Sequence, residues 1–599
     1  TGSDTELILP AYYDTVTVDS QDYVVEKDTG TRITTIGSNA FNNCTGLTSV
    51  TIPSGVTSIG NNAFYGCSSL ATVTFAEGSQ LESIGNNAFY GCSNLTEITL
   101  PSSLTSIGYS AFSGCSNLTE IYYQGTMDQW LNMTFVSSWL PSNNNINLYI
   151  NNELVDEITI NNDIPSYAFC KIDSITKVTL GEGVTSIGRS AFYGCSSLAT
   201  VTFVEGSQLE SIGDYAFYNC SNLTEITLPS SLKSIGSSAF SGCSNLTEIT
   251  LPSSLTSIGR YAFSGCSALR SIEIPASVTS IGNNAFDGCS SLATVTIAEG
   301  SQLESIGDDA FSYCSNLTDI TFPASLTSIG DRAFYGCSSL ATVTFAEGSQ
   351  LESIGNNAFY GCSNLTEITL PSSLTSIGSS AFYGCSGLTE ITLPSNLKGI
   401  GDSAFRDCSS LTEITLPSSL TSIGSSAFYG CSGLTEITLP SNLKGIGDSA
   451  FRDCSSLTEI TLPSSLTSIG SNAFYNCTRL ATVTFAEGSQ LESIGSYAFR
   501  DCSNLTEITL PSSLKSIGYW AFQNCTSLAT VTIESDYIYR DAKGTGNSNA
   551  GGLLANAETV RVLTKIVEEN DNSYLENTAN FTTSTSDDGK YTVFTKVNQ

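Results

Sequence analysis

Apolar and polar residues alternate along most of the chain in a pattern that returns every 23 or 25 residues. One period reads Leu-x-x-Ile-x-Leu-Pro-x-x-Leu-x-x-Ile-Gly-x-x-Ala-Phe-x-x-Cys-x-x, and twenty copies fill roughly residues 34–533. In one copy, Ile98 and Leu100 alternate with polar neighbours, which predicts a short strand with one buried face. Pro101 lacks an N–H group and is expected to end that strand.

The rest of each copy predicts a second extended piece and a tight turn. After Pro101, Ile107 and Gly108 are expected to form this second piece and a sharp corner. Ser110 is expected to cap a single helical turn that ends near Cys115. One copy cannot bury its own Leu, Ile, Ala and Phe side chains, so neighbouring copies must stack into a continuous core. The repeat therefore predicts one long array, although 599 residues would ordinarily suggest several domains of roughly 150 residues each.

The repeated unit resembles the BspA-like leucine-rich repeat of the LRR_5 type, and the resemblance covers more than four-fifths of the chain. It implies a right-handed leucine-rich-repeat solenoid of about 20 units of 23–25 residues, with short parallel strands on the concave face. It also implies a secreted or cell-surface protein for adhesion or host interaction. Such a protein would recognise its partner by an extended surface rather than in a catalytic pocket.

Three segments depart from the repeat. Residues 1–33 are expected to form an N-terminal cap, because an end coil would otherwise expose its core. Residues 121–166 are expected to be an insertion or kink that divides a first repeat block, 34–120, from a second block, 167–533. Residues 534–599 are expected to form a C-terminal cap with a hairpin.

Within the C-terminal cap, the sequence predicts one loop, one strand and one hairpin. Residues 541–552 are rich in Gly, Asn and Ser and are expected to be flexible. The apolar alternation of residues 560–567 predicts a final strand. Asp588 and Gly589 lie between two alternating segments, which is typical of a β-hairpin.

Composition excludes several classes of function. The chain has no His, which excludes Ser-His-Asp and Cys-His catalysis and the common zinc sites. It has 22 Lys and Arg against 56 Asp and Glu, a net charge of −34 that argues against nucleic-acid binding. No stretch of about 18 apolar residues could span a bilayer, and any export signal has been removed or was not included. We expect no catalytic residue, no metal and no cofactor.

The twenty cysteines are not spaced as a disulfide framework. Nineteen of them occupy the same slot of successive copies, so their side chains should point inward in parallel. Parallel side chains one coil apart lie ~4.8 Å from each other, whereas a disulfide needs Cβ atoms ~3.8 Å apart. The pattern therefore predicts free, buried thiols that pack as small apolar groups.

A carboxylate recurs at the outward position of the first strand, and we call this set the acidic stripe. Its members are Glu97, Glu120, Glu225, Glu248, Asp319, Glu367, Glu390, Glu413, Glu436, Glu459 and Glu507. Like charges ~4.8 Å apart repel by about 0.9 kcal/mol per pair in water, and a basic partner or calcium would relieve this repulsion. Copying of the repeat is an alternative explanation, since residues 375–420 reappear at 421–466.

Aromatic residues offer an alternative surface. A row of Tyr that follows Ala-Phe, beginning with Tyr65 and Tyr90, or the inserted Trp130 and Trp139, could bind a glycan or a protein. Structural packing is the other interpretation of both sets. We predict a monomer that binds an extracellular protein or surface polymer with basic character. The alternatives are a glycan-binding module and a passive stalk that carries another domain.

Overall fold

The computed structural model describes residues 5–9, 18–19, 22–23, 32–142, 145–536, 557–569 and 581–596. Most of the predicted N-terminal cap and the whole of the predicted flexible stretch 541–552 lie outside the described residues. Contacts divide the chain into two compact units, Thr1–Leu292 and Ala293–Gln599. The predicted block boundaries around 121–166 therefore stay a prediction.

Most coils supply two short strands, which build two kinds of parallel sheet. The first strands are β1 (Glu6–Ile8), β5 (Ser49–Ile52), β7 (Thr72–Phe75), β9 (Glu97–Leu100), β11 (Glu120–Tyr123), β13 (Asn147–Ile150), β15 (Glu157–Ile160), β16 (Lys177–Leu180), β18 (Thr200–Phe203), β20 (Glu225–Thr227), β22 (Glu248–Thr250), β24 (Ser271–Ile274), β26 (Thr294–Ile297), β28 (Asp319–Phe322), β30 (Thr342–Phe345), β32 (Glu367–Thr369), β34 (Glu390–Thr392), β36 (Glu413–Thr415), β39 (Glu459–Leu462), β41 (Thr482–Phe485), β43 (Glu507–Leu510), β45 (Thr530–Ile533) and β46 (Thr559–Leu563).

The second strands are only two residues long. They are β4 (Thr35–Ile36), β6 (Ser58–Ile59), β8 (Ser83–Ile84), β10 (Ser106–Ile107), β12 (Thr134–Phe135), β17 (Ser186–Ile187), β19 (Ser211–Ile212), β21 (Ser234–Ile235), β23 (Ser257–Ile258), β25 (Ser280–Ile281), β27 (Ser305–Ile306), β29 (Ser328–Ile329), β31 (Ser353–Ile354), β33 (Ser376–Ile377), β35 (Gly399–Ile400), β37 (Ser422–Ile423), β38 (Gly445–Ile446), β40 (Ser468–Ile469), β42 (Ser493–Ile494) and β44 (Ser516–Ile517).

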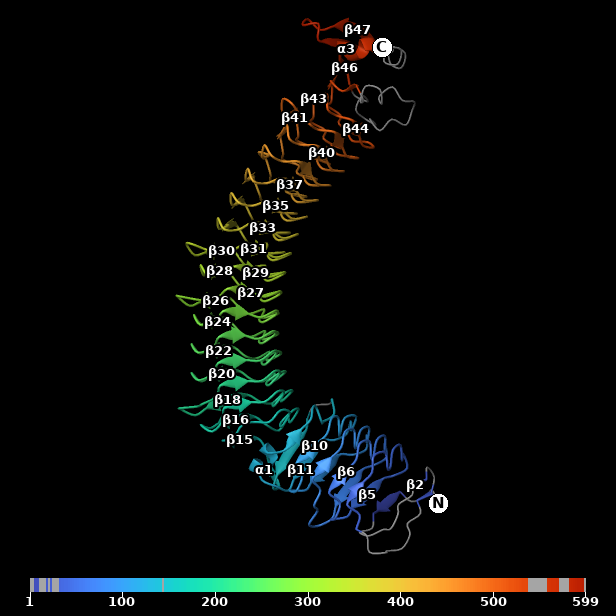
Figure 1. The fold of residues 1–599 in the computed structure, drawn as a ribbon, viewed down its shortest axis with the longest axis vertical. Helices are drawn as coiled ribbons and strands as arrows, with labels where there is room; N and C mark the ends of the chain where they lie inside the picture. The colour runs from blue at the N-terminus through green and yellow to red at the C-terminus, as the bar shows by residue number, and fades with distance from the viewer. Residues whose placement is uncertain are drawn as a thin grey trace. The chain divides into compact units, whose positions relative to one another are not determined.

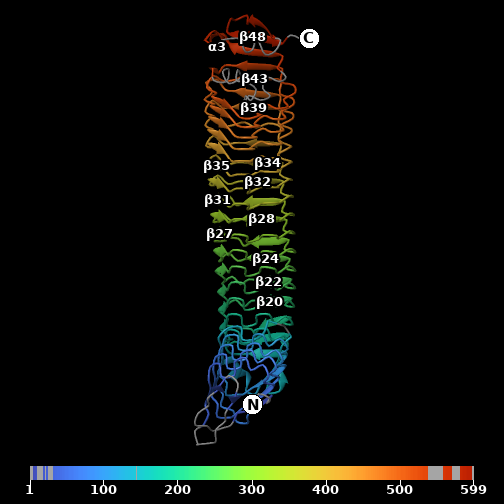
Figure 2. The ribbon, with the colours of Figure 1, turned by 90° about the vertical axis from the view of Figure 1, so that its right-hand side faces the viewer.

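Within each unit the coils stack one on another, as Figures 1 and 2 show. Strand β11 pairs with β9 in parallel and in exact phase with the repeat, so that Ile121 lies opposite Ile98. Coils also continue beyond residues 34–533, because β1 pairs with β5 and β46 pairs with β45. The predicted solenoid is confirmed, with about 22 turns of short parallel strands.

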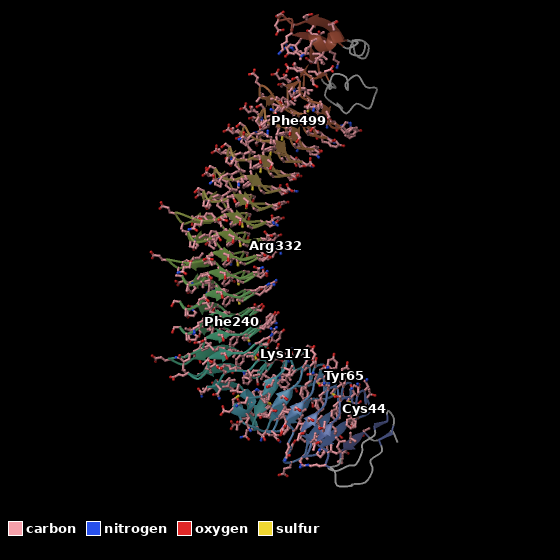
Figure 3. The ribbon with its side chains drawn as sticks, viewed as in Figure 1. Cys44, Tyr65, Lys171, Phe240, Arg332 and Phe499 are labelled. Carbon is pink, nitrogen blue, oxygen red and sulfur yellow. The ribbon has the colours of Figure 1, made fainter. Side chains whose placement is uncertain are left out.

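The core consists of columns of identical residues. The rings of Phe64, Phe89 and Phe112 stack with centroids 5.2 and 5.3 Å apart and planes within 6° of parallel. Similar stacks pass through Phe240 in the first unit and through Phe499 in the second, and both residues are marked in Figure 3. All five side chains are 0% exposed. The 23-residue period is therefore a physical stacking interval.

The segment between Gly108 and the next first strand is a ribbon of turns, not the predicted helical turn. Ser110 has φ +52°, which is the left-handed region and not a helix-capping conformation. In the preceding coils, the N–H of Phe64 donates to the C=O of Ala88 in the next coil, at 2.7 Å. An α-helix would use such an N–H within its own coil. The helical prediction is wrong because stacking supplies these hydrogen bonds between coils instead.

The glycine at the corner after the second strand is required by close approach. A Cβ on Gly108 would lie 2.6 Å from the backbone N of Asn86 and 2.6 Å from the carbonyl carbon of Gly85. Real Cβ atoms do not approach backbone so closely, so only glycine fits. The corner predicted at Ile107 and Gly108 is confirmed.

Both kinds of sheet are interrupted within residues 121–166. Strand β13 ends one first-strand sheet, where it also pairs antiparallel with β14 (Glu153–Leu154). A new first-strand sheet starts at β15, which pairs with β16. Between β11 and β12 the chain forms the short helix α1 (Met127–Leu131), whose Thr126 N-cap and Gln129 make a capping box.

The two ends add further strands. In the N-terminal part, β2 (Val18–Asp19) and β3 (Asp22–Tyr23) form a two-stranded antiparallel sheet. In the C-terminal part, β47 (Phe581–Thr585) and β48 (Tyr591–Lys596) form the hairpin predicted at Asp588 and Gly589, which is confirmed. The predicted strand 560–567 is partly wrong, since β46 ends at Leu563 and helix α3 (Thr564–Glu569) follows.

Helix α3 replaces the end of that strand for a packing reason. Consecutive residues Ile566 and Val567 are both buried, at 3% and 4% exposure. If β46 continued through them, these two neighbours would point to opposite faces of the sheet. A helical turn places both against the C-terminal sheet, where α3 packs on β46 and β48.

Candidate interaction surface

The acidic stripe lies on the outward face of the first strands. Strand β34 shows the pattern, with Glu390 exposed, Ile391 buried and Thr392 exposed. All members of the stripe are exposed except Glu120, which is half-buried. That this outward face is the concave one stays a prediction.

The structure divides the acidic stripe into runs of different length. Strand pairing places Glu367, Glu390 and Glu413 directly opposite one another in three neighbouring coils. The next two coils follow without a break, because Thr415 bridges Thr438 and the N–H of Thr458 donates to the C=O of Thr435. We call this set the five-coil run, and its carboxylates are those of Glu367, Glu390, Glu413, Glu436 and Glu459.

Elsewhere the carboxylates form pairs or stand alone. Glu97 lies opposite Glu120, and Glu225 lies opposite Glu248. The hydroxyl of Tyr122 donates to Glu120, and this hydrogen bond raises the pKa of Tyr122 to about 12. Members in coils flanked by Thr, such as Asp319 between Thr294 and Thr342, have no carboxylate neighbour in the stripe.

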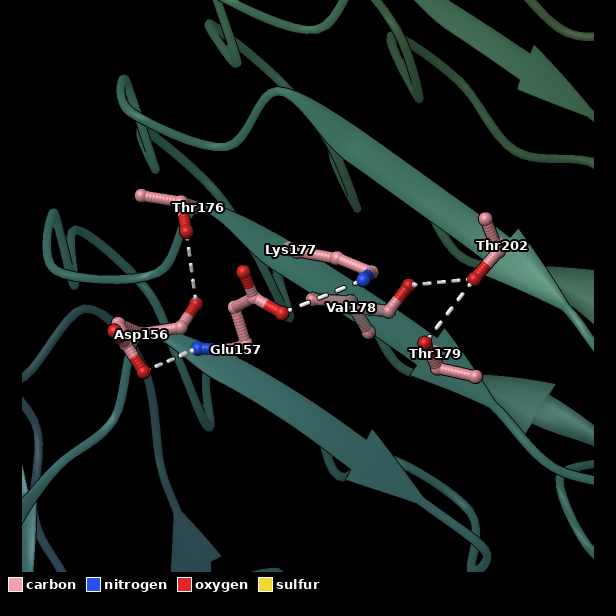
Figure 4. A network of polar contacts seen from close by, with 7 residues as sticks. All are labelled: Asp156, Glu157, Thr176, Lys177, Val178, Thr179 and Thr202. Atoms are coloured by element: carbon pink, nitrogen blue, oxygen red, sulfur yellow. Dashed lines mark hydrogen bonds and ion pairs between the residues drawn. The ribbon is translucent and has the colours of Figure 1, made fainter.

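Within the described part of the chain, the glutamates of the five-coil run make no ion pair with Lys or Arg. By contrast, an ion pair is present at the start of the first-strand sheet that begins with β15, drawn in Figure 4. There Lys177 occupies the stripe slot opposite Glu157, and its ammonium lies 3.3 Å from the Glu157 carboxylate. No described Lys or Arg therefore acts as a counter-ion for the carboxylates of the five-coil run.

Sequence reasoning missed two carboxylates on this face. Glu157 occupies the stripe slot, but it falls inside 121–166, where the repeat phase is lost in the sequence. Glu273 is exposed in β24 at the slot that Thr holds in other coils. The alternation Ser-Ile-Glu-Ile around it was the available signal.

Rings of the Tyr row stack on one another. Tyr65 and Tyr90 are half-buried and stack on each other with centroids 4.9 Å apart and planes within 6° of parallel. Tyr360 is stacked on both sides, at 4.7 Å from Tyr335 and 4.6 Å from Tyr383. A sugar binds an aromatic side chain over its face. An inner ring such as Tyr360 therefore has both of its faces covered by neighbouring rings.

Beyond Tyr383 the same column alternates Tyr with Arg. The guanidinium of Arg406 lies 5.2 Å from the Tyr383 ring centroid and 4.2 Å from that of Tyr429. Arg452 lies in the same way between Tyr429 and Tyr475, at 5.3 and 4.5 Å. These are cation–π distances. From the sequence, Arg406 is only a tolerated exposed variant, but the structure makes it part of a continuous stack.

The two inserted tryptophans are structural. Trp130 and Trp139 are both 0% exposed, and their rings contact each other with centroids 5.9 Å apart. The indole N–H of Trp130 donates to the C=O of Ala168 at 3.1 Å. The alternative in which these two residues bind a ligand is wrong, because no ring face reaches the surface.

The cysteines are free, as predicted, and all twenty except Cys44 are buried. The thiol of Cys243 donates to the C=O of Phe217 in the preceding coil at 3.2 Å. Burial raises the pKa of Cys243 and of Cys337 from 9.0 to about 12. A protonated, buried thiol is a poor nucleophile and a poor metal ligand. The cysteine column therefore belongs to the core and not to a reactive site.

Two further searches concern the described residues only. Among them, no group of three or more Cys, Asp or Glu is arranged to hold a metal ion. No helix in the same part of the chain is long and apolar enough to cross a membrane.

Comparison with solved structures finds other leucine-rich repeat proteins. A leucine-rich repeat protein from Bacteroides ovatus is 36% identical, with 60% of this chain and 84% of that chain covered and a TM-score of 0.48. A leucine rich cell surface protein from Faecalibacterium prausnitzii is 28% identical, with 64% and 86% covered and a TM-score of 0.32. The pneumococcal vaccine antigen PcpA is 25% identical, with 53% and 85% covered and a TM-score of 0.36.

No curated protein is significantly similar to the chain. A family model, by contrast, matches nearly all of the array. The model of the BspA type leucine rich repeat region matches six times, at residues 26–153, 162–293, 245–350, 290–409, 348–458 and 421–542. These matches cover far more than half of the chain and coincide with the stacked coils. The chain belongs to the BspA-type leucine-rich repeat family.

Proposed function

We propose that this chain is a non-enzymatic, secreted or cell-surface protein that binds an extracellular partner with a basic surface through its acidic stripe. One observation carries the proposal. Five exposed glutamates stack in consecutive coils, and no Lys or Arg of the described residues neutralises them. Like charges facing one another destabilise a sheet, so a partner that brings positive charge gains the relief of that repulsion.

Two further features support this role. The net charge of −34 steers cationic partners toward the surface and repels anionic ones. The similar protein from Faecalibacterium prausnitzii is described as a leucine rich cell surface protein. The glycan alternative loses support because the inner rings of the Tyr row cover one another and the two tryptophans of the insertion are buried.

A charge-neutralising variant tests the proposal. Glu390→Gln, Glu413→Gln and Glu436→Gln together remove the centre of the five-coil run. Binding to a ten-residue oligolysine peptide, measured by calorimetry at low salt, is expected to weaken about tenfold, at roughly 0.5 kcal/mol for each exposed contact. The loss should shrink as salt screens the charges.

A matched control separates position from charge. Glu82, Glu304 and Glu352 are also exposed, but each directly precedes a second strand and lies off the stripe. Changing these three to Gln alters net charge equally and should leave affinity within about twofold of the parent. Equal weakening by both triple variants would mean that only the overall charge matters. Unchanged binding by the stripe variant would overturn the proposal and leave the passive stalk.

A further inference from the structure

Five coils carry a longer connection after the first strand, and we call this connection the cassette. It spans residues 75–81, 203–209, 297–303, 345–351 and 485–491, and reads Phe/Ile-Ala/Val-Glu-Gly-Ser-Gln-Leu. It is two residues longer than the Leu-Pro-Ser-Ser-Leu connection of the other coils. The sequence shows this difference only as a change of period, from 23 to 25 residues.

Each cassette is held in one conformation by hydrogen bonds. In 345–351, Gly348 takes φ +77°, and the N–H of Ser349 donates to the C=O of Ala346 at 3.1 Å. The hydroxyl of Ser373, in the next coil, lies within hydrogen-bond distance of the C=O groups of Ser349 and Leu351, at 3.0 and 2.7 Å. The loop is therefore fixed from both sides, although it protrudes beyond its shorter neighbour.

The step between a long and a short connection leaves a pocket on the face that carries the acidic stripe. Beside cassette 345–351 the pocket measures about 340 Å³ and is lined by Thr344, Phe345, Glu367, Thr369 and Pro371, among others. A second pocket of about 350 Å³ has the corresponding residues around cassette 203–209. A third, of about 510 Å³, lies beside cassette 485–491.

The pocket walls combine an aromatic ring with carboxylate. Phe345 is half-buried, with its ring centroid 5.3 Å from that of Phe322, whereas Leu100 at the same slot of a short coil is 0% exposed. Across the pocket, Glu367 begins the neighbouring strand opposite Thr342 and is exposed. No Lys or Arg lines the first two pockets. A ring and a carboxylate that line the same pocket suit a cation at the end of an alkyl chain, through cation–π attraction, stem packing and an ion pair.

We propose that the cassette pockets each accept one lysine or arginine side chain of the basic partner protein. This inference rests on the proposed function and assigns the anchoring sites of its ligand. Within Ala293–Gln599, strands β30 and β41 carry two of the pockets, and the five-coil run fills every coil between them. Six coil steps at ~4.8 Å separate them by about 29 Å, which an extended peptide of about nine residues spans.

The pocket beside 485–491 differs from the pocket beside 345–351 because a cation of the chain lies among its lining residues. Arg561 contributes to its lining together with Glu487, Glu507 and Glu534. The Arg561 guanidinium lies 5.0 Å from the ring centroid of Tyr591, so this cation is held in place. It offsets part of the negative charge that attracts a ligand cation.

The chain itself supplies a conservative variant for the test. Ile297 replaces Phe at the start of the third cassette, where β26 has the same burial pattern as β30. Phe345→Ile and Phe485→Ile therefore keep the fold and the charge but remove the aromatic rings. Affinity for the ten-residue oligolysine peptide should fall about two- to fivefold for each pocket changed.

The reverse substitution and a neutral ligand complete the test. Ile297→Phe adds a ring beside Asp319 and should strengthen binding about two- to fivefold. The same peptide with acetylated lysines should not bind, since it keeps the alkyl chains without the cations. Unchanged oligolysine affinity in both Phe variants would overturn the pockets as cation sites. Phe variants that lose affinity for a neutral polysaccharide, but keep their affinity for the peptide, would also overturn the pockets as cation sites.

The two proposals fail in different ways. If the Phe variants bind oligolysine normally while the Glu390, Glu413 and Glu436 variant binds it more weakly, binding through the acidic stripe is supported and cation binding in the pockets is rejected. If the parent protein does not bind oligolysine at low salt, both proposals are rejected. Unchanged thermal unfolding of the Phe variants would show that any loss of affinity comes from the pocket and not from misfolding.

Discussion

In the coils between β32 and β39 the repeat stacks identical residues twice, once inside and once outside. Inside, the rings of Phe382 and Phe405 lie parallel with centroids 5.4 Å apart. Outside, Glu390 and Glu413 lie directly opposite in adjacent strands. Stacked rings gain contact and exclude water, whereas stacked carboxylates repel. Repetition thus stabilises the inner column and places repelling charges next to one another in the outer column.

Alkaline pH should break the inner column with the largest effect. An unfolded thiol titrates near pH 9.0, whereas burial raises the pKa of Cys243 and Cys337 to about 12. These thiols therefore contribute their full stability below pH 9. Each loses about 1.4 kcal/mol for every pH unit between pH 9 and pH 12, because the unfolded chain ionises first. The sum over many coils should make urea unfolding far easier at pH 10.5 than at pH 8.

Thiol counting checks the state of the same column. At pH 8 in native buffer, a thiol reagent should label few groups besides the partly exposed Cys44. In denaturant it should label close to twenty. A count far below twenty in denaturant would show disulfides between coils and contradict the prediction of free thiols.

A cavity in the Phe column should have the next largest effect. Phe382 is 0% exposed and stacks on both Phe359 and Phe405. Phe382→Ala should cost about 3–5 kcal/mol of unfolding free energy. Each coil contacts only its neighbours, so urea unfolding should also separate into two steps.

A neighbouring position provides the control for that cavity. Leu393 lies in the next coil, is 7% exposed and belongs to the edge of the core. Leu393→Met keeps apolar volume and should cost less than about 1.5 kcal/mol. A Phe382→Ala protein as stable as this control would mean that the ring stack is not what holds adjacent coils together.

The outer column should respond in the opposite direction. The triple variant Glu390→Gln, Glu413→Gln, Glu436→Gln removes all four neighbouring repulsions of the five-coil run. At about 0.5 kcal/mol per pair after screening, the free energy of unfolding should rise by about 2 kcal/mol in low to moderate salt. In 1 M salt the gain should nearly vanish. A variant that binds oligolysine more weakly but has a higher free energy of unfolding would show that the carboxylates favour binding and lower stability.

Much of this contrast can be predicted from the sequence, because a strict period fixes which residues share a column. The outward slot of Glu97 and the inward slots of Phe64 and Cys67 follow from the repeat alone. The turn conformation at Ser110 does not, since it depends on hydrogen bonds between coils. An available signal was that Asn, Ser and Asp often hold this slot, and these residues tolerate the left-handed region.

The pockets are harder to predict from the sequence than the columns, for a different reason. A pocket beside 345–351 requires a long connection next to a short one, so it is a property of two coils and not of one. The sequence displays the lengths but not the step between them. Likewise, Lys177 and Glu157 pair across the segment where the period is lost, so no phase relation connects them beforehand.

The smallest expected effect concerns the one outer column that avoids repulsion. After Tyr383, Arg occurs only in every second coil, and Tyr429 separates Arg406 from Arg452. Two guanidinium groups are thus roughly two coil steps apart, about 9.6 Å, and each lies against Tyr rings and not against a like charge.

Replacing the cation by Arg452→Gln should lower the free energy of unfolding by about 1 kcal/mol. Replacing the spacer by Tyr429→Ala should lower it more, because both arginines lose a ring. If Arg452→Gln instead stabilised the protein as the glutamate variant does, the charges of the Tyr–Arg column would also repel one another. The acidic stripe and the Tyr–Arg column would then not differ in this respect.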